Sequence, residues 1–151
     1  MSHRPINVVG PALYLGGVAL ATIAFIPFPQ AAAHQIEVSR DVGATLHVEP
    51  NDRPRAGVET LVWFALTQKG GRGIPLAQCN CQLEVYPQPE TTTPLLTPAL
   101  RAVSAERFQG IPGADITFPK AGGYLLKLSG TPTGEIQFDP FELTFEVLVT
   151  R

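Results

Sequence analysis

The amino-acid sequence predicts an all-β fold, an antiparallel β-sandwich of about seven strands, because three observations favour short strands over helices. Apolar and polar residues alternate with a period of two in several stretches, as they do in strands with one buried face. After residue 33, no stretch shows the 3.6-residue period of an amphipathic helix. The 151 residues include 15 Pro and 14 Gly, which suit frequent turns and disfavour a long helix bundle.

Residues 1–33 are predicted to be a signal peptide or membrane anchor, and residues 34–151 a single domain. Residues 8–28 form an uncharged apolar run, and the triplet 31–33 offers the small residues that a signal peptidase requires before His34. Cleavage there gives a periplasmic or extracellular protein. The alternative is an uncleaved anchor, since the run is long enough to span a membrane, and the domain then faces away from the cytoplasm.

The strands of the domain are predicted where the alternation is clearest. In residues 141–150, aromatic and aliphatic residues occupy every second position, which indicates a strand with one buried face. Residues 60–66 (TLVWFAL) are apolar on both faces and are expected to form a central strand covered on each side. Shorter strands are expected at residues 36–38, 46–49, 81–85, 116–118 and 124–128.

Residues 87–113 interrupt this pattern with a long, proline-rich connection. We expect it to lie extended over the sandwich, with a short strand near residues 100–103 or a helical turn near residues 104–108. Trp63 and Phe64 point to opposite faces of their strand, so one of them leaves the main core. That side chain is expected either to lie under the connection or to form a contact surface for an envelope protein or a membrane surface.

The pair Cys79 and Cys81 is the most distinctive local feature. Residues i and i+2 of a strand share a face, so both sulfurs are expected on one side. Three alternatives remain open: a disulfide, which an oxidising compartment favours; a thiolate pair for Cu(I) or Zn(II); and two unlinked thiols, available to another molecule.

Two histidines in the domain are further candidate metal ligands. If cleavage follows Ala33, His34 offers a terminal amine and a ring nitrogen to one Cu(II) ion. His47 alternates with Leu46 and Val48 and is expected to face solvent. A hairpin turning at residues 40–43 pairs residue 36 near residue 47, which puts His34 and His47 on the same face. The candidate metal ligands are therefore Cys79, Cys81, His34 and His47, with copper or zinc as the metal.

Charge and motifs exclude several functional classes. The net charge of −2 and the pI of about 5.9 argue against nucleic-acid binding, which normally requires a basic surface. Glu142 and Glu146 lie four residues apart on one predicted strand, about 13 Å, which is too far for a glycosidase pair. The chain has no Gly-x-Ser-x-Gly motif and no phosphate-binding glycine loop before a helix. No catalytic residue and no organic cofactor is predicted.

The run from Phe118 to Leu128, FPKAGGYLLKL, resembles the penultimate strand of bacterial Ig-like modules. Residues 44–150 as a whole resemble small exported sandwiches of the YtkA/FixH-like and CopC-like kind. This resemblance implies an Ig-like sandwich, in which Tyr124 hydrogen-bonds the backbone as a corner tyrosine. CopC-like proteins begin their mature chain with His, which His34 matches, but their late Asp-x-His pair has no counterpart, since no His follows His47.

Two functions are consistent with these features. The first is an exported, non-catalytic binding or accessory module whose partner is unknown. The alternative is a periplasmic copper- or zinc-handling protein that uses the Cys-x-Cys pair and His34.

Overall fold

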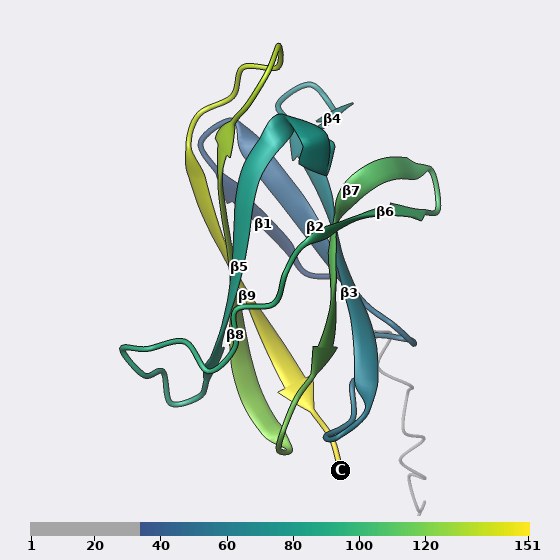
Figure 1. Ribbon diagram of the computed structural model, residues 1–151, viewed down its shortest axis with the longest axis vertical. Helices are drawn as coiled ribbons and strands as arrows, with labels where there is room; N and C mark the ends of the chain where they lie inside the picture. The colour runs from purple at the N-terminus through teal and green to yellow at the C-terminus, as the bar shows by residue number, and fades with distance from the viewer. Residues whose placement is uncertain (1–33) are drawn as a thin grey trace, which may run out of the picture. The chain divides into compact units, whose positions relative to one another are not determined.

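In the computed structural model, which describes residues 34–151, two antiparallel sheets pack face to face (Figure 1). This confirms the predicted all-β sandwich. Among these residues, no helix is long and apolar enough to cross a membrane. The predicted signal peptide or anchor at residues 1–33 lies outside the described part of the chain.

The larger sheet has the strand order β1-β2-β3-β7-β6, and the two-residue strand β4 pairs with β3. Its strands are β1 (Ile36–Ser39), β2 (Val42–Val48), β3 (Glu59–Gln68), β4 (Arg72–Gly73), β6 (Arg101–Ala105) and β7 (Phe108–Thr117). The smaller sheet has the order β5-β8-β9. Its strands are β5 (Cys79–Pro87), β8 (Gly122–Pro132) and β9 (Phe141–Val149), and a 3-10 turn, η1 (Leu76–Gln78), precedes β5.

The main core lies between the two sheets because their inward faces carry the apolar residues of the alternation. In β9 every second residue from Phe141 to Val149 is buried, as the sequence pattern predicts. Phe145 of this strand meets Phe64 of β3 across the sandwich, with ring centroids 5.5 Å apart. The fold is therefore held mainly by apolar contact between the layers.

A second, smaller apolar cluster lies on the outer face of β3. β7 pairs with β3 only as far as Trp63 and Gly113, and its earlier residues stay paired with β6 alone. This β6–β7 hairpin projects from the side of the sandwich in Figure 1. Val103 and Ile111 of the hairpin pack with Trp63 and Ala65 of β3, so β3 is covered on both faces.

The predicted proline-rich connection differs most from the sequence interpretation. The short strand expected near residues 100–103 is confirmed as β6, and residues 104–108 end β6 and begin β7 instead of forming the helical turn that was the alternative. The resulting hairpin covers the outer face of β3. The corner tyrosine is confirmed, since the Tyr124 hydroxyl donates to the Lys120 carbonyl at 2.8 Å. Residues 34–151 form nine strands where about seven were predicted, because β4 and β6 add to the count, and the strand predicted at residues 116–118 begins earlier, as β7.

Candidate functional site

The pairing of β1 with β2 brings His34 beside His47. Ile36 lies opposite Thr45, and the Leu46 amide donates to the Gln35 carbonyl at 3.0 Å, so the same register carries residue 34 to residue 47. The two imidazole ring centroids are 4.2 Å apart and the rings are inclined by 40°. The predicted register was two residues off, but a shift of two keeps every side chain on its face.

His47 is buried, which contradicts the prediction that it faces solvent. Its cross-strand neighbour is Trp63, and the two rings are stacked in parallel with centroids 3.7 Å apart. Only 8% of His47 remains exposed. The physical reason is that the outer face of the sheet is not solvated here, since His34 covers one side of the imidazole and Trp63 the other.

Burial also sets the protonation of His47. Loss of solvation lowers its pKa below the usual value of 6.5, and the positive charge of a protonated His34 lowers it further. Glu106, Asp52 and Glu49 oppose this effect through their negative charges. The His47 imidazole is therefore neutral near pH 7 and has a nitrogen lone pair available to a metal ion.

Two carboxylates fix the surroundings of the histidine pair. Glu49 Oε1 accepts a hydrogen bond from Trp63 Nε1 at 3.1 Å, which holds the indole that stacks on His47. Asp52 Oδ1 accepts from the Val48 amide at 2.8 Å, and its Oδ2 lies 3.3 Å from His34 Nδ1. Asp52 is a site residue that the sequence analysis does not identify. An Asp side chain that closes a turn onto a nearby amide was the available signal.

The His34 side of this group opens into a hollow of about 220 Å³ between β2 and β9. His34, Asp52 and Glu146 supply polar atoms to its lining, and Leu46, Val48 and Leu148 supply apolar ones. His34 is half exposed while His47 is buried, so His34 is the more accessible member of the pair.

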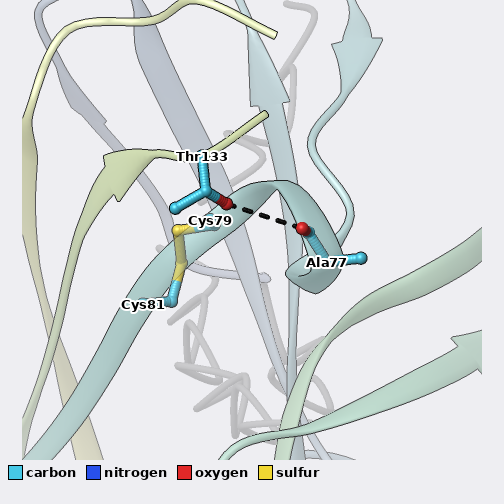
Figure 2. Close-up of a disulfide and its surroundings, with 4 residues drawn as sticks. All are labelled: Ala77, Cys79, Cys81 and Thr133. Atoms are coloured by element: carbon cyan, nitrogen blue, oxygen red, sulfur yellow. Dashed lines mark hydrogen bonds between the residues drawn. A yellow bond between two sulfur atoms is a disulfide. The ribbon is translucent and has the colours of Figure 1, made fainter. Parts of the chain in front are cut away.

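The other candidate ligands, Cys79 and Cys81, are joined by a disulfide (Figure 2), with their Cα atoms 5.1 Å apart. Their sulfurs share a face, as the strand alternation predicts, but in this form neither can bind a metal as a thiolate. The metal assignment of these two residues is therefore corrected. Within residues 34–151, no three or more His, Cys, Asp or Glu side chains are arranged to hold a metal ion.

Trp63 and Phe64 do not form the predicted contact surface. Phe64 is fully buried in the main core and Trp63 is 1% exposed in the outer cluster. Trp63 is the side chain that leaves the main core, and the β6–β7 hairpin, which belongs mostly to the 87–113 stretch, covers it. This agrees with the alternative prediction, in which that side chain lies under the connection. The exposed apolar residues lie elsewhere, among them Ile36, Val38 and Leu148.

No protein-family model matches the chain, and no curated protein matches it. Among solved structures, it is similar to the crystal structure of a DUF4426 family protein from Pseudomonas aeruginosa PAO1, with a TM-score of 0.53 and 13% sequence identity. The similarity covers 82% of this chain and 98% of that protein. At this level of identity the likeness concerns the fold alone.

Proposed function

We propose that this protein is an exported, non-catalytic metal-binding module that holds one Cu(II) ion between His34 and His47. The observation that carries the proposal is the 4.2 Å separation of the two imidazole ring centroids. His47 lies in β2 and His34 lies just before β1, thirteen positions earlier in the chain. Two imidazoles held this close, one of them kept neutral by burial, form a preorganised pair of nitrogen donors.

Cleavage after Ala33 supplies the third donor. The new α-amine of His34 and the ring nitrogen of the same residue chelate one ion, and His47 adds a second imidazole. Asp52 Oδ2, near His34 Nδ1, offers an oxygen. Three nitrogens and one oxygen suit the tetragonal coordination of Cu(II), which also binds nitrogen donors more tightly than Zn(II) does.

The test uses the protein exported with its own N-terminal segment, after its intact mass has located the cleavage point. Cu(II) is titrated while the fluorescence of Trp63 is followed, which is specific because the sequence holds a single Trp. The Trp63 ring stacks on His47 at 3.7 Å, so a Cu(II) ion on that imidazole quenches the indole. We expect quenching that saturates at one equivalent.

Three variants separate this site from other binding. Ser inserted between Ala33 and His34 removes the terminal chelate, and His47→Gln removes the second imidazole. Each is expected to weaken Cu(II) binding about 100-fold, the upper range seen when a metal site loses a supporting group. The double variant Cys79→Ser/Cys81→Ser is the control and is expected to bind as before. Unchanged affinity in His47→Gln, or preference for Zn(II), would refute the assignment.

A second candidate function is an accessory module that contacts an envelope protein through β1. The observation that favours it is the exposure of Ile36 and Val38, which are 66% and 71% exposed on this edge strand. Crosslinking in the intact envelope, followed by mass spectrometry, tests it. A specific partner that is lost in Val38→Glu but kept in the control Val58→Glu supports this function, and an identical crosslink pattern in both opposes it.

A further inference from the structure

The two halves of the Cys79–Cys81 disulfide have different surroundings. Cys79 is 6% exposed and packs against β8, where a side chain on Gly130 would lie 2.6 Å from its sulfur. Cys81 is only partly buried and lines a groove of about 340 Å³ between β5 and residues 97–100. An incoming group therefore reaches the disulfide at the Cys81 end.

The disulfide does little to hold distant parts of the chain together. Both cysteines lie in the same strand, two residues apart, so the bond closes the smallest kind of loop and removes little entropy from the unfolded chain. β5 is paired with β8 along its whole length, from Cys79 opposite Pro132 to Pro87 opposite Tyr124. Opening the bond therefore leaves the strand in place.

β5 also forms an edge of its sheet. The backbone N–H and C=O of Val85 point away from β8 and bond to Leu96 and Leu95. Because backbone direction repeats every two residues, those of Leu83 and Cys81 point to the same open side. Within the described chain they have no backbone partner there, so the groove beside Cys81 is bordered by an open strand edge.

We propose that Cys79 and Cys81 form a reversible dithiol–disulfide couple that oxidises the dithiol of another molecule, entering at the Cys81 sulfur. A thiolate of the dithiol attacks Cys81 Sγ, the bond between the two sulfurs breaks, and Cys79 leaves as a thiolate that takes up a proton. The second thiol of the same molecule then attacks the mixed disulfide and releases Cys81. The other molecule gains a disulfide and loses two electrons and two protons, which this protein takes up. This couple is independent of the proposed metal site.

The first experiment equilibrates the exported protein with mixtures of reduced and oxidised dithiothreitol and counts thiols by alkylation and intact mass. We expect full, reversible reduction without denaturant, with the Trp63 fluorescence unchanged because the outer cluster stays folded. A pair that remains oxidised until the protein is denatured would overturn the proposal, and so would reduction that unfolds the domain.

The second experiment identifies the reactive sulfur by trapping. Cys79→Ser leaves Cys81 alone in the groove, and Cys81→Ser is the matched variant with only the buried sulfur. With oxidised glutathione, Cys79→Ser is expected to form a mixed disulfide at least about tenfold faster, because exposure controls thiol exchange. Equal rates, or faster reaction of Cys81→Ser, would overturn the assignment of Cys81. Rates with dithiothreitol and with a reduced two-cysteine peptide then distinguish a small-molecule dithiol from a polypeptide.

Discussion

The two pairs of potential metal ligands in this domain reach opposite outcomes. Cys79 and Cys81 are close in sequence and lie on one strand, and they bond to each other. His34 and His47 are far apart in sequence, and the pairing of β1 with β2 brings their rings together. Two imidazole side chains do not bond covalently to each other as two thiols do, so the histidine pair keeps its nitrogen lone pairs. Closeness in sequence is thus a poor guide to which side chains remain available as ligands.

The surroundings of the two pairs differ as well. The histidines lie on the outer face of the larger sheet, supported by the aromatic surface of Trp63 and open to a hollow at His34. The disulfide lies at one end of the smaller sheet, where Cys79 faces the crowded interior. Four predictions test this contrast, from the largest expected effect to the smallest.

Trp63→Ala is expected to destabilise the domain most, by about 3–5 kcal/mol, because it leaves a large cavity under the β6–β7 hairpin and uncovers His47. Trp63→Phe keeps an aromatic ring there and is expected to cost less. Urea denaturation followed by circular dichroism measures both, with the exposed substitution Val58→Ala as a control. A loss below about 1 kcal/mol in Trp63→Ala would mean that the outer cluster is not a supporting surface for the histidines.

Gly130→Ala tests the crowding at the disulfide. The added Cβ would lie 2.6 Å from Cys79 Sγ and 2.7 Å from the Phe141 ring, so we expect a loss of about 1–3 kcal/mol from overpacking. Gly73→Ala is the matched control, since nothing lies within 4 Å of the position of its Cβ. Equal stability of the two variants, measured by the same denaturation, would show that the disulfide end can relax.

The fold could be predicted from sequence because alternation reports directly on burial, as the confirmed β9 shows. The register of the first hairpin could not. The prediction used a turn over residues 40–43, whereas Ser39 pairs with Val42 and the turn is only two residues long. Arg40 takes a positive φ of 57° there, without the Asn-Gly or Asp-Gly sequence that normally signals such a turn.

The candidate site was also predictable only in part, because local patterns indicate which face of a strand a residue occupies but not what packs over it. Strand parity placed His34 and His47 on one face, and this survives a register error of two residues. The burial of His47 depends on Trp63 and on the β6–β7 hairpin that packs over Trp63, a long-range arrangement that no local pattern indicates. The position of Asp52 beside His34 likewise depends on how the turn after β2 folds back.

Loss of the disulfide is expected to have a smaller effect than Trp63→Ala, and an effect in the lower half of the range given for Gly130→Ala. For a loop of three residues, the loop-entropy relation gives about 1.6 kcal/mol at 25 °C. The variant Cys79→Ser/Cys81→Ser, compared with the oxidised protein by urea denaturation, measures it. A loss above about 4 kcal/mol would mean that the disulfide stabilises the fold as much as one that closes a long loop. The contrast between the supporting ring of Trp63 and a disulfide that the fold does not need would then be lost.

The smallest expected effect is a dependence of stability on pH that comes from His47. Its pKa is lowered in the folded protein, by burial first and by His34 second, so between its lowered value and about 6.5 the unfolded chain binds a proton that the folded protein does not. The free energy of unfolding therefore falls as the pH drops below about 6.5, and it is insensitive to His47 above that value.

Thermal unfolding between about pH 5 and pH 8, with a chelator present, measures this slope in the wild-type protein and two variants. His47→Gln is expected to flatten it, and His34→Gln to reduce it in part, because His34 supplies only the second cause. The carboxyls of Asp41 and Asp115 also have lowered pKa values, through hydrogen bonds from Gln68 and Arg101 respectively. Their effect begins only near their ordinary value of 3.8, so it lies outside this window. A slope that persists in His47→Gln would mean that His47 is solvated like an ordinary surface histidine, and the contrast between the two ligand pairs would then rest on the disulfide alone.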